Sequence, residues 1–385
     1  YIVTWALGHL VTLKDPEDYD KKYKEWNMAV LPMMPEKLQI KVIPQTGKQY
    51  HAVTTQLARK DVGEVVIATD AGREGELVAR WILDKAHNQK PCKRLWISSV
   101  TDKAIREGFA SLKDAKEYDN LYRAAVSRAE ADWLVGINAT RALTCKYNAQ
   151  LSCGRVQTPT LAMIAQREQE IREFVPKPYY TVTAAAGGAV YTWKDEKSGG
   201  TRISDPEKAK QIAEKAKRYP LVLQKVEKKK KQKEAPLLYD LTELQRDASA
   251  RFGYSAKQTL NLMQSLYETH KVLTYPRTDS RYLTKDIVPT LKERLDAVSI
   301  GPYKTLAQQA KRRPLKEKPG FVNDAKVSDH HAIIPTEQYV QLSALSNEER
   351  RIYDLVVRRF LAVLLPPCVY EETVIQDSIE KECFT

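Results

Sequence analysis

The segment 64–110 constrains the fold more than any other part of the chain, because it alternates between two kinds of hydrophobic periodicity. EVVIATD is a β-branched apolar run, which is typical of a buried strand, and it ends in an acid. EGELVARWILDKA then places Leu77, Trp81 and Ile82 at helical spacing, and KRLWISSV predicts a second strand. A strand, a helix and a strand in this order favour an α/β unit with parallel strands.

Helical patterns dominate residues 119–175. Apolar side chains recur at helical spacing in SRAEADWLVGINATRAL and in TPTLAMIAQREQEI, where Pro159 stands near the start as helix beginnings favour. Residues 176–236 instead alternate short strand-like runs with Gly and Ser turns, around one helical insert that Asp205 can cap. We therefore expect a helical region followed by a β-rich one.

The second half of the chain returns to helices and then to a strand. The basic run KVEKKKKQKE at 225–234 is interpreted as a solvated linker without a specific role. LTELQRDASARFGYSAKQTLNLMQSLYETH then predicts two helices separated by Gly253, the second capped by Ser255. Residues 345–365 are again helical in pattern, and CVYEETVIQDSIEKECFT begins a new strand. A β-rich segment entered twice makes the helical insertion between its halves a separate lobe.

The charge balance favours a polyanionic partner. The 385 residues carry 62 Lys and Arg against 49 Asp and Glu, which gives a formal net charge of +13 and a pI near 9.3. Nucleic acid is the leading candidate for that partner, and a merely solubilising surface is the alternative. The length predicts about two or three domains and a sizeable core.

The sequence also argues against several protein classes. No apolar run approaches the ~18 residues needed to cross a bilayer, and YIVTWALGHL lacks the basic start and cleavage site of a signal peptide. The five cysteines form no C-x-x-C pair, which favours free thiols in a reducing cytosol over a zinc finger or a disulfide framework. PQTGKQY lacks the upstream glycine and the hydroxyl of a P-loop, so ATP hydrolysis of that kind is not supported.

The stretch ATDAGREGE places acids where the first predicted strand meets the helix. Ligands bind at the carboxyl ends of parallel strands in α/β sheets, and Asp70 with Glu74 can share a hard divalent cation such as Mg²⁺. The alternative is that Glu74 and Glu76 only favour the positive N-terminus of the helix. For an acidic strand end alone, this alternative is the stronger one.

The stretch HKVLTYPRTDSRYL, residues 270–283, presents a tyrosine beside cations and hydroxyls. A tyrosine can act as a covalent nucleophile that splits a hard displacement into two reversible steps. Attack on a phosphodiester builds negative charge on the phosphoryl oxygens, which Arg277 and a nearby histidine would stabilise. Pro276 restricts Tyr275 to an extended backbone. Taken alone, however, any one of the 20 tyrosines is far more often a packing residue.

Two further stretches carry groups that can contact a nucleic acid. KVSDHHAIIPTE places His330 and His331 before an apolar run, where they suit acid/base work or phosphate contact; zinc is disfavoured without further ligands. In QLSCGRVQTPTL, Gly154 permits close backbone approach, and Arg155 with Gln157 offers donors to a phosphate or a base edge. For the first stretch the alternative is a pair of histidines in a turn without function. For the second it is an ordinary helix start that contains a glycine.

Taken together, these stretches resemble the type IA DNA topoisomerases, and among them the bacterial topoisomerase III group. ATDAGREGE looks like the family's acidic Toprim motif, and LSCGRVQTPTL looks like its DNA-gate helix motif. LTYPRTDS looks like the active-site tyrosine motif, and HHAIIPT like the family's histidine stretch. SRAEADWLVGINATRAL and LQRDASARFGYSAKQTL also match, so the resemblance covers nearly the whole chain.

The resemblance assigns roles to particular residues. It implies that Tyr275 breaks one DNA strand, forms a 5′-phosphotyrosine link and leaves a 3′-hydroxyl. Arg277 would support the scissile phosphate, and His330 would aid phosphate binding or acid/base work. Asp70 and Glu74 match the Toprim acids that hold Mg²⁺ and keep the 3′ end positioned for rejoining. The positions expected to bind DNA are Arg128, Asp132, Ser152, Arg155, Gln157, Thr278 and Ser280.

The sequence departs from the family pattern in two places. Gly72 stands where the family's Asp-x-Asp-x-Glu motif usually has its second Asp, so a full acidic triad is not expected. The family's opening strand, with its Glu and Lys, is not part of the chain, which begins at Tyr1, and further residues are expected after Thr385. This chain alone is therefore expected to be inactive.

The implied fold is α/β plus mixed, arranged as a ring. Its expected parts are a Toprim α/β domain at 1–118, a helical DNA-gate domain beginning at 119–175, a β-rich arch at 176–236, an α+β, winged-helix-like lobe with the tyrosine at 237–364, and the return strand of the arch at 365–385. The reaction would use Mg²⁺ but neither ATP nor zinc. The expected substrates are single-stranded and negatively supercoiled DNA, with RNA as a further candidate. The protein is expected to be a cytoplasmic, nucleoid-associated bacterial monomer with no membrane contact and a helicase as a candidate partner.

Two other functions stay open at this point. One is a Toprim-containing nuclease or primase-like phosphotransferase, in which Tyr275 merely packs. The other is a non-catalytic single-strand nucleic-acid binder that uses a basic groove. The tyrosine motif discriminates among them, because a nuclease needs ATDAGREGE but has no use for TYPRTDS. The sequence does not rank relaxation against decatenation.

Overall fold

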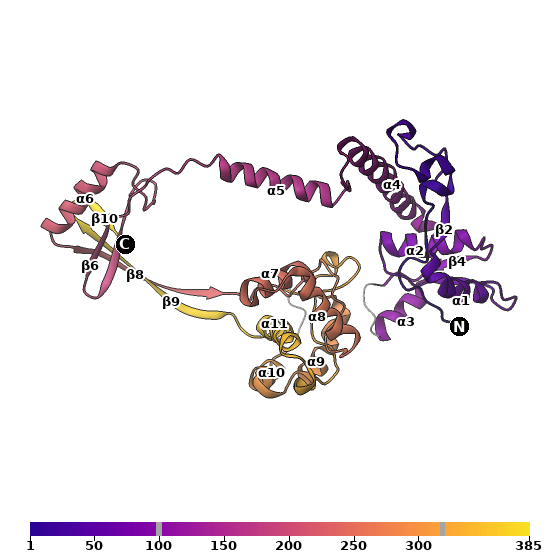
Figure 1. Ribbon diagram of the computed structural model, residues 1–385. Coiled ribbons are helices and arrows are strands. Elements are labelled where there is room, and N and C mark those ends of the chain that lie inside the picture. The colour runs from indigo at the N-terminus through magenta and orange to yellow at the C-terminus, as the bar shows by residue number, and fades with distance from the viewer. Residues whose placement is uncertain (98–101, 316–319) are drawn as a thin grey trace. The chain divides into compact units, whose positions relative to one another are not determined.

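The computed structural model describes residues 1–97, 102–315 and 320–385, and the chain divides into two compact units (Figure 1). The first unit combines Tyr1–Met163 with Pro236–Leu365. The second combines Ile164–Ala235 with Pro366–Thr385. Within the described ranges, no helix has an apolar stretch long enough to cross a membrane.

A small mixed sheet lies at the centre of the N-terminal part of the first unit. Strand β3 (Val65–Ile67) pairs in parallel with β4 (Cys92–Arg94), and β4 pairs antiparallel with β5 (Lys113–Asp114). Helix α2 (Arg73–Lys85) connects the two parallel strands. The predicted strand–helix–strand unit is therefore confirmed, and the end of its second strand, at 98–100, lies outside the described residues.

Further elements pack around this sheet and give it a core. Strands β1 (Val11–Leu13) and β2 (Ile40–Val42) form an antiparallel pair. Helix α1 (Gly47–Leu57) precedes β3 in the chain, and α3 (Asp102–Ala110) lies between β4 and β5. Apolar side chains in and just before β1, in α1 and in α2 are buried together with Ala125 of helix α4 (Asp119–Tyr147): Leu10, Val11, Leu13, Val53, Leu77, Trp81 and Ile82. This core fixes α2 and therefore the turn that precedes it.

Two long helices follow, as the pattern of residues 119–175 predicted. Helix α4 (Asp119–Tyr147) packs against α2 and ends at Asn148, which has a left-handed backbone with φ of 46°. Helix α5 (Gln157–Arg172) buries none of its side chains, and the boundary between the two units falls within it.

The C-terminal part of the first unit is a helical lobe with short extended segments. Its helices are α7 (Leu241–Phe252), α8 (Ala256–Glu268), α9 (Leu291–Ala297), α10 (Lys304–Lys311) and α11 (Asn347–Leu364). As predicted, Gly253 ends α7 with φ of 71°, and the Ser255 side chain accepts a hydrogen bond from the Gln258 N–H to begin α8. The lobe core lies under α11, where Phe360 and Val357 are fully buried.

Bridges between distant segments position the tyrosine stretch inside this lobe. Leu273 pairs with Pro335, and Tyr239 pairs with Ile333, each as an isolated antiparallel bridge. The residues that follow Leu273 therefore run beside the HHAIIPT segment. Short 3₁₀ helices complete the described elements: η1 (Pro16–Asp18), η2 (Lys21–Lys24), η3 (Met28–Val30), η4 (Pro44–Thr46), η5 (Ala115–Tyr118), η6 (Lys285–Thr290), η7 (Gly301–Tyr303), η8 (Asp324–Lys326) and η9 (Leu342–Ala344).

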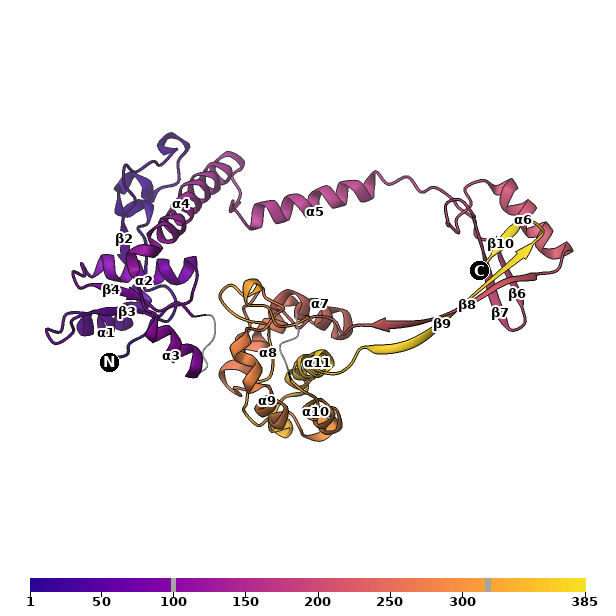
Figure 2. The same ribbon diagram turned by 180° about the vertical axis from the view of Figure 1, so that it is seen from behind.

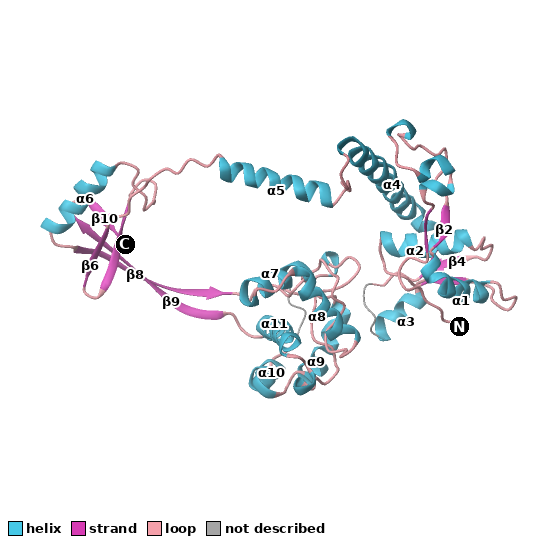
Figure 3. Ribbon diagram, viewed as in Figure 1, coloured by secondary structure: helices cyan, strands magenta, loops and turns pink. Residues whose placement is uncertain are grey.

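The second unit is a five-stranded antiparallel sheet covered by one helix, coloured by element type in Figure 3. In spatial order its strands are β6 (Thr183–Ala186), β7 (Ala189–Lys194), β10 (Glu382–Phe384), β9 (Cys368–Ile379) and β8 (Val222–Lys233). Helix α6 (Pro206–Arg218) is capped by Asp205, as predicted, and buries Ile212 in a core with Trp193 and Phe384. The sheet thus joins strands from before and after the helical lobe.

The basic run at 225–234 is not a linker, so that prediction is wrong. Nearly all of it belongs to β8, which runs side by side with β9 over its length (Figure 2). Acidic side chains on β9 compensate the lysines across the pair, as in the ion pairs Lys228–Glu371, at 3.3 Å, and Lys231–Glu372. Because β8 is an edge strand, its exposed lysines also discourage pairing with other chains.

Candidate active site

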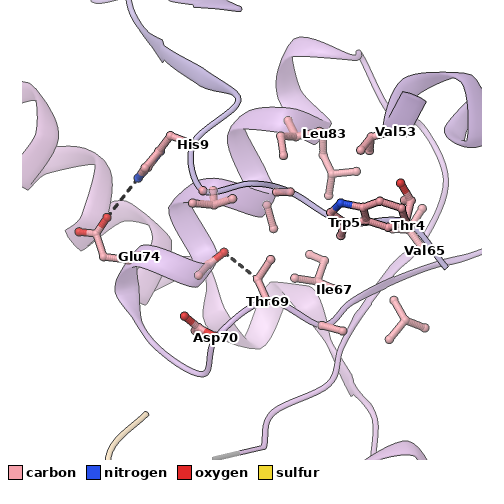
Figure 4. A pocket seen from close by; sticks show the side chains of 18 of the residues that line it. Thr4, Trp5, His9, Val53, Val65, Ile67, Thr69, Asp70, Glu74 and Leu83 are labelled. Carbon is pink, nitrogen blue, oxygen red and sulfur yellow. Dashed lines mark hydrogen bonds and ion pairs between the residues drawn. The ribbon is translucent and has the colours of Figure 1, made fainter. Parts of the chain in front are cut away.

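The turn between β3 and α2 has a tightly constrained backbone. A Cβ atom at position 75 would lie 2.0 Å from the Asp70 carbonyl oxygen, so only glycine permits this close approach. The Thr69 hydroxyl donates to the Gly75 carbonyl at 2.8 Å, an interaction drawn in Figure 4. These contacts place Asp70 at the carboxyl end of a parallel strand and Glu74 in the first turn of α2.

A buried ion pair supports the same turn from beneath. Arg94 and Glu76 are almost completely buried, and Arg94 Nε donates to Glu76 Oε1 at 2.6 Å. The Arg94 guanidinium also donates to the backbone carbonyls of Ile67, Thr69 and Asp70 at the end of β3. Burial lowers the pKa of Arg94 and opposes the charged form, which Glu76 favours. Arg94 therefore fixes the backbone at the end of β3 and, with it, the position of the Asp70 side chain.

The two motif carboxylates have different surroundings. Glu74 accepts from His9 Nε2 at 3.3 Å, as Figure 4 shows, and lies 3.5 Å from an Arg128 nitrogen. Asp70 instead lies near the tyrosine-bearing lobe, with its Oδ2 3.8 Å from His330 Nε2. The nearby His330 imidazole lowers the pKa of Asp70, and this outweighs the opposing effect of partial burial. Both carboxyl groups are exposed enough to meet a substrate or an ion.

Tyr275 lies in an extended segment directly after the Leu273–Pro335 bridge. Its ring lies 4.3 Å from the His330 ring and 5.5 Å from the Tyr267 ring, measured between centroids. Partial burial raises the pKa of Tyr275, Asp70 raises it further, and Arg277 acts in the opposite direction. The phenol is therefore protonated at neutral pH, and attack by its oxygen requires that the proton be removed.

Thr278 and Ser280 tie the tyrosine segment to its neighbours. Both are buried, and the Thr278 hydroxyl donates to the His330 carbonyl at 2.8 Å. The Ser280 hydroxyl donates to the Lys326 carbonyl, also at 2.8 Å. These bonds hold Tyr275 and His330 side by side. Direct DNA contact by the two hydroxyls remains a prediction.

The two adjacent histidines have different environments. His330 is partly exposed and faces Tyr275 and Asp70. His331 is partly buried; its Nδ1 donates to the Ala332 carbonyl at 2.7 Å, and desolvation lowers its pKa to about 4. His331 is therefore neutral at physiological pH and serves packing, whereas His330 is available to a substrate.

One pocket of about 720 Å³ brings these groups together. Its lining includes the Asp70 and Glu74 carboxylates, His9, Tyr275 and Arg277, together with apolar residues of β3 and α2. Figure 4 shows this pocket with Trp5 and Ile67 among its walls. A phenol, a guanidinium, an imidazole and carboxylates in one place suit attack on a phosphodiester.

Comparisons with known proteins agree with this chemistry. The family model described as DNA topoisomerase matches residues 116–385, and the model described as Toprim domain matches residues 1–100. The chain belongs to the type IA DNA topoisomerase family. DNA topoisomerase 3 of Bacillus subtilis (strain 168) and that of Bacillus licheniformis are each 60% identical over 385 residues, which is all of this chain and 53% of each relative. The chain thus spans about half the length of these relatives.

A solved structure supports the fold. The full-length topoisomerase I from Thermotoga maritima aligns with a TM-score of 0.69 at 24% sequence identity. The alignment covers 98% of this chain and 60% of that chain. The resemblance to type IA topoisomerases stated from the motifs is therefore confirmed at the level of family and fold.

The helical residues that topoisomerase motifs assign to DNA binding lie on α4 and in the segment leading to α5. Asp132 on α4 accepts from Arg155 Nε at 2.5 Å, and the pair is partly exposed. Gln157 begins α5 and lies close to Gly154, where a Cβ atom would come within 3.1 Å of the amide nitrogen. Ser152 is exposed, and Arg128 is paired with Glu74. Their DNA contacts remain predictions.

Reasoning from the sequence did not predict the contacts of four residues around the turn between β3 and α2. His9 binds Glu74, and Arg94 with Glu76 supports the turn. Asp329 comes so close to Gly72 that a Cβ atom at position 72 would lie 2.7 Å from both of its carboxylate oxygens. Burial raises the pKa of Asp329. An arginine inside the apolar run KRLWI was a usable signal for Arg94, whereas nothing in the local pattern distinguishes His9 or Asp329.

Proposed function

We propose that the protein to which this chain belongs cleaves one DNA strand transiently, without ATP, through a phosphotyrosine at Tyr275. Another strand passes through the break, and the break is resealed, which relaxes negative supercoils or decatenates DNA. The observation that carries the proposal is that the Tyr275 ring lies against the His330 ring. His330 Nε2 in turn lies 3.8 Å from Asp70 Oδ2. A nuclease or a passive binder gives no reason for a tyrosine in that place.

The reaction balances without an external energy source. The Tyr275 oxygen attacks the phosphorus, the bond from phosphorus to the 3′ oxygen breaks, and the phenolic proton is removed while the 3′ oxygen gains one. His330 is the group placed to accept and return a proton beside Tyr275, and its Nε2 lies 3.8 Å from Asp70 Oδ2. Arg277 lines the same pocket and offsets the negative charge of the phosphoryl oxygens. Rejoining is the reverse attack by the 3′-hydroxyl, so the bond energy is retained.

We also propose Mg²⁺ as the cofactor. In the described part of the chain, no three His, Cys, Asp or Glu side chains are already gathered as a metal site. Asp70 and Glu74 nevertheless fit Mg²⁺, which is commonly held by one or two carboxylates, with water and substrate phosphates completing its coordination. When bound, the ion would neutralise phosphate charge and help hold the 3′ end.

The substrate proposal follows from the charge of the chain and from the chemistry of the phosphodiester. Single-stranded or negatively supercoiled DNA suits a basic chain with a net charge of +13, and RNA is a second candidate because attack on the phosphodiester is chemically the same. We further propose a nucleoid-associated monomer in the bacterial cytoplasm that works with a helicase.

Covalent capture tests the proposal. The full-length protein is incubated with 3′-end-labelled single-stranded DNA and Mg²⁺ and then denatured. We expect labelled DNA attached to the wild-type protein and none attached to Tyr275→Phe, because the phenolic oxygen is the nucleophile. Tyr282→Phe is the matched control: it removes a hydroxyl, bound by Lys326, from the same segment and should leave the adduct unchanged. An adduct of wild-type amount with Tyr275→Phe would show that another group attacks.

A further inference from the structure

The backbone conformation at position 72 does not require a glycine. Its φ is −164° and its ψ is 178°, an extended backbone that any residue adopts. A Cβ atom there would instead crowd a neighbouring side chain, since it would lie 2.7 Å from both carboxylate oxygens of Asp329 and 2.9 Å from its carboxyl carbon. A contact under 3 Å to a carboxylate would force that side chain away. The small residue at 72 and the acid at 329 therefore fit each other.

The Asp329 carboxylate is available for a ligand. Across the described residues it takes part in neither a hydrogen bond nor an ion pair, whereas the nearby Asp279 accepts from the Ser328 hydroxyl at 3.2 Å. The position it covers lies between Asp70 and Glu74 in the chain, where the Toprim pattern usually has an acid of its own.

We propose that Asp329 replaces the acidic side chain that position 72 lacks, so that the tyrosine-bearing lobe supplies the third carboxylate of the Toprim cation site. The inference rests on the proposed function of that site and adds a residue to it. Asp329 precedes His330, which already faces Asp70, so both side chains reach the acidic turn from one backbone segment. Mg²⁺ prefers carboxylate oxygens, and a third carboxylate raises the affinity of such a site for a divalent cation.

The source of this carboxylate has a consequence for the reaction cycle. The Asp70 and Glu74 carboxylates belong to the Toprim part, whereas Asp329 belongs to the lobe with Tyr275. A cation held by all three therefore binds the state in which the lobe touches the Toprim part more tightly than a state in which they separate. Cation binding and contact between the lobe and the Toprim part are therefore coupled through this one side chain.

Direct measurement of Mn²⁺ binding tests the inference without relying on activity. Free Mn²⁺ is followed by electron paramagnetic resonance as it is titrated into the full-length protein without DNA. We expect Asp329→Asn to weaken Mn²⁺ binding by about tenfold or more, the scale of losses around metal sites. Glu293→Gln, which removes an exposed acid of the same lobe, is the matched control and should bind like wild type.

A carboxylate swap makes the test specific. Gly72→Asp combined with Asp329→Ala moves the acid from the lobe to the turn and removes the side chain that excluded it, so Mn²⁺ affinity should recover to within about threefold of wild type. Unchanged affinity in Asp329→Asn, or no recovery in the swap, would overturn the inference. If an adduct forms at Tyr275 but Mn²⁺ affinity does not depend on residue 329, only this inference is refuted. Asp329-dependent binding without an adduct refutes only the proposed reaction.

Discussion

At the scale of single residues, burial separates functional groups from supporting ones that look alike in sequence. His330 and His331 are adjacent, yet only His330 faces Tyr275 and Asp70. Glu74 and Glu76 are two positions apart on α2, yet Glu74 lines the pocket and Glu76 is buried against Arg94. A lone partner left from that buried pair would be an uncompensated charge, which typically costs about 3–5 kcal/mol.

The lowered pKa of His331 predicts how the free energy of unfolding depends on pH. Burial lowers its pKa from the ordinary 6.5 to about 4, so between those values the unfolded chain binds a proton that the folded chain does not. The neutral His331 contributes roughly 3 kcal/mol to the free energy of unfolding. This contribution is complete above pH 6.5 and is lost as the pH falls to 4. Urea unfolding of the full-length protein between pH 4 and 8 should show this loss.

Two variants isolate that contribution. His331→Asn removes the titrating group and should flatten the pH dependence of the unfolding midpoint across this window. His51→Asn removes an exposed histidine of α1 and should leave the dependence as in wild type. A slope that survives in His331→Asn would mean that other groups cause it.

At the scale of elements, the turn from β3 into α2 is defined by close backbone contact. Gly75→Ala would bring a methyl group to 2.0 Å from the Asp70 carbonyl oxygen, so the turn must move and Asp70 with it. We expect the yield of covalent adduct to fall by about tenfold or more and the thermal midpoint to fall, because displacements of about 1 Å at such sites have large effects.

A second glycine provides the control for this prediction. Gly63 precedes β3, and a Cβ atom there would meet nothing within 4 Å. Gly63→Ala should therefore leave the adduct yield and the thermal midpoint near wild type. If both variants behaved alike, the close approach at Gly75 would not be what positions Asp70.

The β8–β9 pair shows how an element can be hidden by its composition. Five of the residues from Lys225 to Lys231 are lysines, a run typical of a solvated segment. Lysines so close together repel one another. Pairing with β9 offsets this repulsion, because Glu371 and Glu372 lie across from lysines of β8. The acids that make the strand possible lie more than a hundred residues later in the chain.

At the scale of the whole molecule, the net charge of +13 predicts salt-dependent DNA binding. The logarithm of the affinity of full-length protein for single-stranded DNA should fall linearly with the logarithm of salt concentration. Arg155→Gln should reduce the magnitude of that slope by about 0.7 if Arg155 contacts one phosphate.

Arg59→Gln serves as the control for the salt dependence. Arg59 is exposed after α1 and is paired with Asp61 at 2.7 Å, away from the pocket residues. Its removal should leave the slope unchanged. Equal slopes in Arg155→Gln and wild type would show that Arg155 makes no phosphate contact.

The secondary structure was largely readable from the sequence because its signals are local. Apolar spacing predicted α2 and α11, and the caps at Asp205 and Ser255 marked where α6 and α8 begin. The ordered set of motifs around Asp70, Tyr275 and His330 sufficed to recognise the family. Such patterns depend on neighbours within a few residues or on short strings that can be compared directly.

The tertiary structure alone decided which of these residues meet. Asp329 reaches Gly72 across 257 positions, and Arg94 reaches the end of β3 through a buried network that its apolar neighbours conceal. Space above a glycine, burial of a charge and the distance between two segments are properties of packing, which no local pattern records. For that reason the sequence showed a missing acid at position 72, and only the fold showed another carboxylate in its place.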